Sequence, residues 1–205
     1  MLRNDPLTPR LERALRRAAA WHAGQARRGS GVPYVQHVVA VAWMLDRLGF
    51  SETVVVAGLL HDAVEDTEAT ADQIAEEFGP EVAELVVHSS EVKLDAEGRK
   101  RPWIDRKRDH LAALAEAPTE ARAIGLADKL HNLLSIQVDL EEGRPVWSAF
   151  HARRDQVLWY YRAMIDVLDG GDPRLNALAS RARTALAEIE GLTSGAGDQA
   201  TLGER

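Results

Sequence analysis

The 205-residue chain contains no cysteine. This absence excludes disulfide bonds and thiolate metal sites, so any bound metal would be held by histidine and carboxylate side chains. A chain without cysteine also fits a reducing compartment, and we expect the protein to be cytoplasmic. Hydrophobic residues make up 45% of the chain, which is enough for a globular core.

Long apolar runs are also missing. No stretch approaches the about 18 consecutive apolar residues of a membrane span, and the N-terminal residues 1–6 lack the apolar stretch of a signal peptide. The formal net charge of −7 argues against general binding to nucleic acid. We therefore expect neither a membrane nor a nucleic-acid partner, and a phosphate-rich substrate would need a local basic cluster.

No long stretch alternates apolar and polar residues as a strand does, so the sequence predicts an all-α fold. Its length suits one domain, which we assign to residues 1–192. We expect the Ser- and Gly-rich residues 193–205 to form a disordered tail. Capping residues, glycines and prolines delimit the expected helices, which cover residues 9–23, 34–48, 52 onward through the motif described next, 71–78, 80–89, 102–115, 118–134, 156–168 and 173–190.

The segment Leu59–Thr67 places an adjacent His61 and Asp62 directly after an apolar run, and Glu65 and Asp66 follow them. If this segment is helical, His61 and Glu65 share one face, because residues four apart are neighbours on a helix. Ionisable groups beside a hydrophobic run are costly unless a metal ion or a charged partner satisfies them. The alternative is a helix that leaves the core with its acids in water, but matching segments elsewhere favour a site.

Two other predicted helices carry matching ligands. His37 lies in the first turn of the helix over residues 34–48, and Asp128 lies in an almost wholly apolar helical segment. An acid inside a buried helix needs a partner, either a basic side chain or, more strongly, a metal cation. The combined donor set suits a six-coordinate Mn²⁺ or Fe²⁺ with open positions, and Zn²⁺ also accepts such ligands. This predicted metal site consists of His37, His61, Asp62 and Asp128.

A metal ion held in this way would polarise a phosphoryl oxygen and lower the pKa of a bound water. Glu65 and Asp66 lie one turn beyond the His–Asp pair, where they could orient that water and move its proton. Hydrolysis of a phosphate or diphosphate ester is the reaction that this chemistry favours.

Candidate substrate contacts come from basic segments. A glycine-rich loop over residues 24–34 contains Arg27 and Arg28, which could grip phosphate. A later polar segment adds Lys93 among several other cations. The alternative for the loop is an ordinary turn, since Arg-Gly-Ser turns are common, and the alternative for the later segment is a solvated surface that balances nearby acids. We expect the phosphates and the nucleoside of a small-molecule nucleotide to be bound by Arg27, Arg28, Lys93 and Asn132.

These motifs resemble a known family. The metal-ligand pattern is similar to the signature of the HD superfamily of metal-dependent phosphohydrolases. The flanking residues 24–37, 59–67 and 126–132 resemble the hydrolase domain of the RelA/SpoT homologues, and the likeness covers roughly residues 8–170. The resemblance implies an HD-domain helical bundle, of the class of stand-alone small alarmone hydrolases, which uses Mn²⁺ to remove the 3′-pyrophosphate from guanosine tetra- and pentaphosphate.

The resemblance also implies roles for single residues. The counterparts of His37, His61, Asp62 and Asp128 hold the metal in that family, those of Glu65 and Asp66 handle the catalytic water, and those of Arg27 and Asn132 contact the nucleotide.

Two departures from the family pattern bear on the substrate. The loop over residues 29–32 is one residue longer than the commonest form, so either Arg27 or Arg28 could take the arginine role. The threonine that usually precedes Lys93 is missing, and residues 101–107 and 158–161 look more like the small bacterial HD hydrolases, whose substrates are less uniform. The alternatives are therefore another nucleotide, such as an adenosine alarmone or a nucleotide phosphate, and a module that senses nucleotide without turnover.

Overall fold

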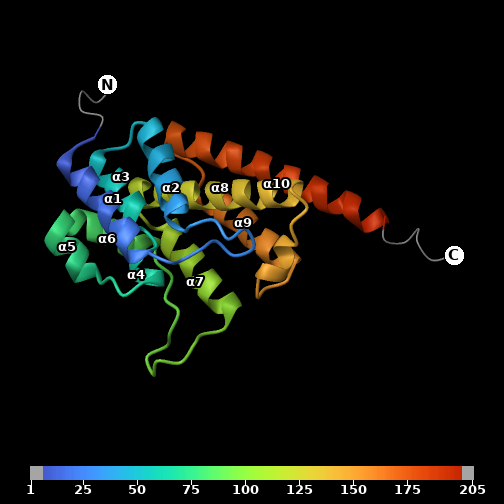
Figure 1. The fold of residues 1–205 in the computed structure, drawn as a ribbon, viewed down its shortest axis with the longest axis horizontal. Coiled ribbons are helices and arrows are strands. Elements are labelled where there is room, and N and C mark those ends of the chain that lie inside the picture. Colours follow the sequence, from blue (N-terminus) through green and yellow to red (C-terminus); the bar gives the residue numbers. More distant parts are fainter. Residues whose placement is uncertain (1–6, 200–205) are drawn as a thin grey trace.

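The protein is built from helices, as the sequence predicted. The computed structural model describes residues 7–199, and within them the β-type pairings are two isolated bridges, Ala26 with Pro33 and Leu94 with Lys100. No helix in this range is both long enough and apolar enough to cross a membrane. The elements (Figure 1) are α1 (Pro9–Trp21), α2 (Val35–Arg47), α3 (Glu52–Leu60), α4 (Ala63–Asp66), α5 (Ala71–Phe78), α6 (Pro80–Ser89), α7 (Trp103–Ala115), α8 (Thr119–Glu141), the 3₁₀ helix η1 (Val146–Ala149), α9 (Arg154–Leu168) and α10 (Pro173–Gln199).

Local sequence signals set several helix starts. The side chains of Thr8 and Ser51 each accept a hydrogen bond from a backbone N–H three residues later, and they cap α1 and α3. Thr70 and Gln73 form the predicted capping box of α5. Because these caps satisfy backbone N–H groups that have no partner within the helix, they fix where each helix begins.

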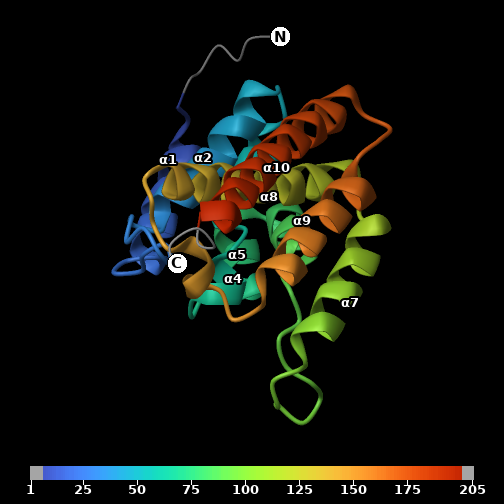
Figure 2. The same cartoon turned by 90° about the vertical axis from the view of Figure 1, so that its right-hand side faces the viewer.

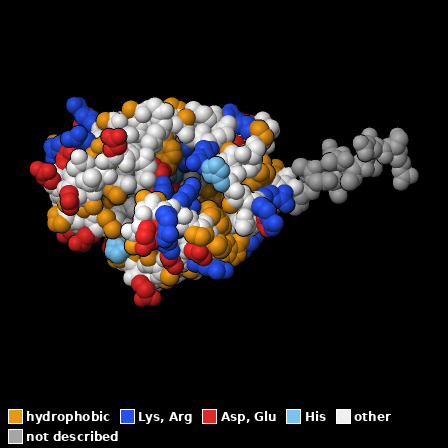
Figure 3. All heavy atoms as spheres, turned by 90° about the horizontal axis from the view of Figure 1, so that it is seen from below, with side chains coloured by type: hydrophobic (Ala, Val, Ile, Leu, Met, Phe, Trp, Pro, Cys, Tyr) orange, Lys and Arg blue, Asp and Glu red, His pale blue; other side chains and the backbone are white. Residues whose placement is uncertain are grey.

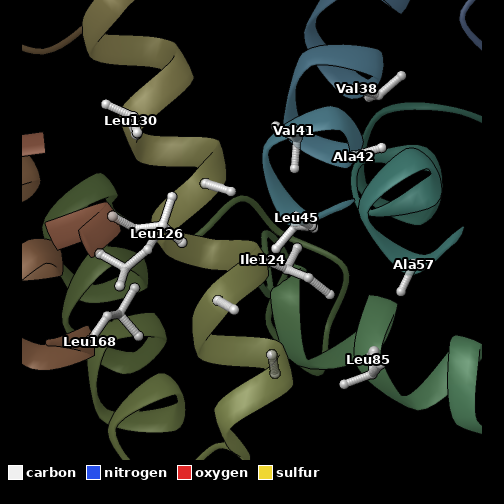
Figure 4. Close-up of a cluster of buried hydrophobic side chains, with 14 of the residues drawn as sticks. Val38, Val41, Ala42, Leu45, Ala57, Leu85, Ile124, Leu126, Leu130 and Leu168 are labelled. Atoms are coloured by element: carbon white, nitrogen blue, oxygen red, sulfur yellow. The ribbon is translucent and has the colours of Figure 1, made fainter. Parts of the chain in front are cut away.

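Helix α8 lies at the centre of the core. It packs against α2, α3, α6, α7, α9 and α10, and its contact with α10 is the most extensive. Figure 2 shows α10 passing across α8. Ile124, Leu126 and Leu133 of α8 are fully buried. Figure 4 shows part of this cluster, in which apolar side chains from α2, α3, α6, α8 and α9 converge. Burial on several sides holds α8 firmly, and so it holds the polar residues that α8 carries.

Gly58 lets α3 lie very close to α2. A Cβ atom at this position would lie 2.6 Å from Cδ1 of Leu45, which is fully buried. Glycine therefore sets the distance between α2, which carries His37, and α3, which ends directly before His61. Its backbone carbonyl also accepts a hydrogen bond from Nδ1 of His61 at 2.9 Å, so the same residue helps to orient a predicted ligand.

The helix expected to run through the His–Asp motif is interrupted there. Helix α3 ends at Leu60 and α4 begins at Ala63, with a turn at His61 and Asp62 between them. Asp62 has φ −95° and ψ −3°, which departs from helical geometry. The polar contacts of both side chains, described below, outweigh the local preference for a continuous helix.

The C-terminal segment also differs from expectation. Helix α10 continues to Gln199, so residues 193–199, expected to be disordered, are helical. Adding residues to an existing helix costs little compared with starting one, and the buried first turns of α10 provide that start. Residues 200–205 of the predicted tail lie outside the described residues.

Candidate active site

Four candidate metal ligands from three segments meet at one place. Nε2 of His37, on α2, lies 3.3 Å from Oδ2 of Asp62 and 3.3 Å from Oδ1 of Asp128, on α8. Nε2 of His61, in the turn between α3 and α4, lies 3.1 Å from the same Oδ2 of Asp62. One ligand atom each from His37, His61 and Asp128 lie within 4.8 Å of one another. The structure therefore brings together all the residues that the sequence singled out as ligands.

The hydrogen bonds of His61 leave one ring nitrogen available for a metal ion. Its Nδ1 faces the carbonyl oxygen of Gly58, which can only accept, so Nδ1 carries the proton in the neutral ring. Nε2 then carries a lone pair, and it is buried without a hydrogen-bond partner although a carboxylate oxygen lies nearby. A buried lone pair beside carboxylates is costly by itself and is satisfied by a cation. Without metal that cation is a proton, because Asp62 outweighs the effect of burial and raises the pKa of His61 to about 9, and a metal ion would take the place of this proton. The donor set thus fits a divalent metal ion.

The two carboxylates of the cluster are held in their ionised form. Burial opposes this, but His61 and His37 outweigh burial and hold the pKa of Asp62 well below its usual range. Burial also opposes ionisation of Asp128, and there the neighbouring Lys129 and His37 lower the pKa. Ionised carboxylates are the state that metal binding requires.

Two residues that the sequence analysis did not assign to the site hold the ligands in place. The phenol of Tyr34 donates a hydrogen bond to Oδ2 of Asp62 at 2.6 Å. Nδ1 of His131 lies 2.8 Å from Nδ1 of His37, and burial, together with the electrostatic effect of His37 and Arg27, lowers the pKa of His131 to about 3. The sequence contained a signal for both residues: Tyr34 lies three residues before His37, and His131 lies three residues after Asp128, so each is at helical spacing from a predicted ligand.

Glu65 and Asp66 lie on α4, and one lysine bridges them. Nζ of Lys93 donates to Oδ1 of Asp66 at 2.7 Å and lies 3.2 Å from Oε1 of Glu65. The backbone N–H of Glu91 donates to the other carboxylate oxygen of Glu65 at 3.0 Å. Burial and the charge of nearby Asp62 raise the pKa of Glu65 against the effect of these donors. A carboxylate with a raised pKa is better suited to accept and return a proton near neutral pH.

The arginine and asparagine predicted to contact substrate meet beside the cluster. Arg27 donates a hydrogen bond to Oδ1 of Asn132 at 2.6 Å, although the two residues lie 105 positions apart in the chain. Both line a cavity of about 480 Å³, whose wall also includes Arg28, Tyr34 and Asp66. This volume lies in the range of small-ligand sites. Lys93 instead lines a neighbouring cavity, and Arg28 lines both.

Comparison with known proteins identifies the family. Residues 14–157 match the family model described as HD domain. The chain belongs to the HD domain family. Because the matched residues extend from α1 into α9, they include the whole of the site described above.

Two curated relatives of this HD-domain chain show the range of proteins that it resembles. It is 37% identical over 164 residues to the guanosine-3′,5′-bis(diphosphate) 3′-pyrophosphohydrolase MESH1 of Drosophila melanogaster, a match that covers 78% of this chain and 86% of that protein. It is 42% identical over 122 residues to the probable GTP diphosphokinase RSH2, chloroplastic, of Oryza sativa subsp. japonica. That second match covers 57% of this chain but 17% of the relative, so this chain spans a small part of the larger protein.

Solved structures agree with the family assignment. A metazoan ortholog of SpoT, described as hydrolysing ppGpp and playing a role in starvation responses, is similar with a TM-score of 0.73 and 30% identity. That match covers 87% of this chain and 96% of the other. A protein from Listeria monocytogenes EGD-e is similar with a TM-score of 0.64 and 37% identity, over 75% of this chain and 94% of that one. Both neighbours support the HD-domain helical bundle.

Proposed function

We propose that this HD-domain protein hydrolyses the 3′-pyrophosphate of guanosine 3′,5′-bis(diphosphate) and of the corresponding pentaphosphate, with GDP or GTP and pyrophosphate as products. The observation that carries the proposal is the pair Glu65 and Asp66, joined by Lys93 beside a His–Asp cluster that fits a divalent metal. The similarity to the Drosophila pyrophosphohydrolase, over 86% of its length, supports the choice of substrate. We place the reaction in a single domain over residues 1–192 and, from the lack of cysteine, in the cytoplasm.

In this proposal the metal is Mn²⁺, with Fe²⁺ and Zn²⁺ as competitors for the same ligands. When bound, such an ion supplies a Lewis acid for the phosphoryl oxygens and a water of lowered pKa. The imidazole Nε2 atoms and the carboxylates of the cluster would hold it. Gly58 orients His61 and His131 orients His37, each through the ring nitrogen that faces away from the carboxylates. The ligand residues are His61, His37, Asp62 and Asp128.

The residues of α4 handle the proton of the attacking water. Glu65, whose pKa is raised, accepts this proton. The water oxygen then forms a bond to the phosphorus next to the 3′ oxygen, the bond between that phosphorus and the 3′ oxygen breaks, and the 3′ oxygen takes up a proton. Asp66 orients the water, and Lys93 keeps both carboxylates in position.

The cavity beside the cluster binds the nucleoside part of the substrate. Arg27 and Asn132 are already joined by a hydrogen bond, which preorganises both groups for ligand contact. Arg28 lies on the wall that this cavity shares with its neighbour. Apolar side chains of Ile136 and Phe150 complete a wall suited to a base and its ribose.

The test is pyrophosphate release by the purified protein with Mn²⁺. We expect release from guanosine 3′,5′-bis(diphosphate), little from the adenosine counterpart, and none from GTP. The control is Asp62→Asn, which removes one ligand and should abolish both metal binding and turnover. Release from the adenosine compound alone would overturn the guanosine assignment. Binding of nucleotide without turnover of any compound, in a protein shown to hold its metal, would make the protein a sensor.

A further inference from the structure

Lys and Arg side chains gather around a hollow on the face of the molecule that Figure 3 shows. Groups that bind a substrate are effective only if the catalytic side chains beside them are also held in position, and this requires support from within the protein. His22 is a buried residue placed to give such support. It directly follows the last residue of α1, and its side chain is 3% exposed. The reaction proposed for the site uses no atom of this side chain.

One ring nitrogen of His22 fixes the orientation of the side-chain amide of Gln25. Nε2 of Gln25 donates a hydrogen bond to the backbone carbonyl of Asp66 at 2.8 Å, and this carbonyl can only accept. The amide oxygen of Gln25 therefore faces the other way, where it lies 2.8 Å from Nδ1 of His22. Because an amide oxygen also can only accept, Nδ1 carries a proton and donates it to this bond. His22 thus determines which end of the Gln25 amide meets Asp66.

The carbonyl that Gln25 contacts lies at the end of α4. This helix is one turn of four residues, which is too short to be stable by itself. The last carbonyl groups of a helix have no partner within it. In α4, Nζ of Lys93 donates to the carbonyl of Glu65 at 3.0 Å, and Gln25 donates to that of Asp66. Because the two proposed catalytic carboxylates extend from these same residues, the contact with Gln25 helps to fix where the carboxylate of Asp66 lies.

The ring of His22 also packs against Tyr34. The two rings are stacked, with 5.0 Å between their centres and 29° between their planes. Tyr34 in turn donates a hydrogen bond to Asp62, and its ring centre lies 5.4 Å from that of His37. His22 therefore supports the residue that contacts two of the predicted metal ligands. Neither contact uses Nε2 of His22, which is buried without a hydrogen-bond partner.

We propose that His22 is a positioning residue for the hydrolysis, and that it holds two parts of the site through different atoms of one ring. Its Nδ1–H orients Gln25 and, through Gln25, Asp66. The face of its ring supports Tyr34 and, through Tyr34, Asp62. This inference rests on the proposed function for the reaction that the positioning serves. The two tasks can be separated by substitution, because one needs a hydrogen-bond donor and the other needs a ring.

The first experiment compares two substitutions of His22 in the full-length protein by steady-state kinetics and by calorimetric titration with Mn²⁺. His22→Phe keeps a ring against Tyr34 and removes the donor. We expect kcat for guanosine 3′,5′-bis(diphosphate) to fall about 3- to 10-fold, the weight of one hydrogen bond, with KM and Mn²⁺ affinity within about twofold of wild type. His22→Asn keeps a donor at the place of Nδ1 and removes the ring. It should bind Mn²⁺ about tenfold more weakly and, once saturated with Mn²⁺, keep the wild-type kcat.

The matched control is His88→Phe. It makes the same chemical change at an exposed histidine of α6, which has no contact with Gln25 or Tyr34 among the interactions of the described residues. This variant should change neither kcat nor Mn²⁺ affinity.

The second experiment tests the path through Gln25, which is half-buried and therefore tolerates substitution better than His22. Gln25→Met removes both hydrogen bonds of the amide and should lower kcat at least as much as His22→Phe does. The double variant should be no slower than Gln25→Met alone, since the second substitution removes a contact that is already lost. Losses that multiply in the double variant would show that His22 does not act through Gln25.

A third measurement does not depend on turnover. In α4 the backbone N–H groups of Asp66 and Thr67 donate to the carbonyls of Asp62 and Ala63. Hydrogen exchange of these two amides in the metal-free protein reports how firmly α4 is held. Exchange should be about threefold or more faster in His22→Phe and Gln25→Met, and unchanged in His22→Asn.

These readouts separate the inference from the proposed function. A protein that cleaves no guanosine compound, but whose variants divide as expected in hydrogen exchange and Mn²⁺ affinity, would keep the role of His22 and lose the assigned reaction. In an active protein, equal effects of His22→Phe and His22→Asn on kcat and on Mn²⁺ affinity would mean a general loss of structure and would overturn the inference. So would variants that change neither quantity.

Discussion

At the scale of single residues, the site depends on which nitrogen of each imidazole carries a proton. The Gly58 carbonyl determines this for His61, because a carbonyl oxygen can only accept. For His37, Nδ1 faces Nδ1 of His131, so one proton must lie between two nitrogens. If Nε2 of His37 is to bind metal, Nδ1 of His37 must donate and His131 must accept.

A prediction follows for His131. His131→Phe removes the acceptor and should weaken Mn²⁺ binding by roughly 10- to 100-fold, the usual weight of a residue that orients a metal ligand. His131→Asn is the matched control, because its side-chain oxygen can take the place of the ring Nδ1 and should restore most of the affinity. Titration calorimetry with Mn²⁺ measures both variants. An affinity for His131→Phe equal to that of the wild type would remove His131 from its positioning role.

The acids of α4 lead to a second prediction. Glu65→Gln and Asp66→Asn should each slow turnover by roughly 10²- to 10⁴-fold, the usual contribution of a positioned acid–base group. Metal affinity should change little, since the carboxylates of both residues pair with Lys93 and not with the histidines of the cluster. Single-turnover rates and Mn²⁺ titration together test this. A double variant that keeps the full rate would exclude both residues from the proton transfer.

At the scale of the elements, α8 has two tasks that its sequence combines. One set of its residues fills the core, while Asp128, Lys129, His131 and Asn132 extend from little more than one turn of the helix into the site or its walls. The turn between α3 and α4 supplies His61 and Asp62 opposite them. Because α8 is packed on several sides, a substitution that removes core packing from α8 should lower the free energy of unfolding more than it changes the reaction at the site.

Core substitutions in α8 test this. Ile124 is fully buried, so Ile124→Ala should lower the free energy of unfolding by about 2–5 kcal/mol and Ile124→Val by about 0.5–1.5 kcal/mol. Val138, on the same helix but 50% exposed, is the control, and Val138→Ala should change stability by no more than about 0.5 kcal/mol. Urea unfolding in the presence of EDTA measures all three. A loss at Ile124 no larger than at Val138 would contradict the central place of α8.

At the scale of the whole molecule, one buried histidine links folding to pH. His110 lies on α7, with Nδ1 2.9 Å from the hydroxyl of Tyr160 on α9 and with Nε2 buried and without a hydrogen-bond partner. Burial, together with the positive charges of Lys129 and Lys107, lowers the pKa of His110 to about 4. A histidine in an unfolded chain has a pKa of about 6.5. The unfolded state therefore binds this proton first as the pH falls.

The difference between these two pKa values predicts that the folded state loses stability over a defined pH range. The contribution of neutral His110 is fully present above pH about 6.5, is lost as the pH falls towards about 4, and stays lost below that. At pH 5 the loss should be roughly 2 kcal/mol. His110→Asn does not titrate and keeps a side-chain oxygen near Tyr160, so its stability should fall less between pH 7 and pH 5 than that of the wild type. Equal falls in urea unfolding of the two proteins would show that His110 titrates normally in the folded state.

How well the sequence predicts the structure depends on how far apart in the chain the interacting residues lie. The predicted helical fold is confirmed. It could be predicted because capping residues and apolar spacing are local signals that act within a few residues of each other. Such signals failed at His61 and Asp62, where contacts with residues distant in the sequence interrupt the helix. The assignments of ligands, acids and substrate contacts stay predictions, although the structure places these residues together.

By itself, the sequence determined the chemical types available to this protein: a helical chain without cysteine, with histidines and carboxylates at positions suited to a metal and with cations nearby. Only the tertiary structure decided which of them meet. It paired Arg27 with Asn132, placed His131 behind His37, and collected lysines and arginines from four segments around one cavity. Donor type is a property of a side chain and can be read from the residue, whereas a site requires distances between segments, and those distances are set by how the helices pack.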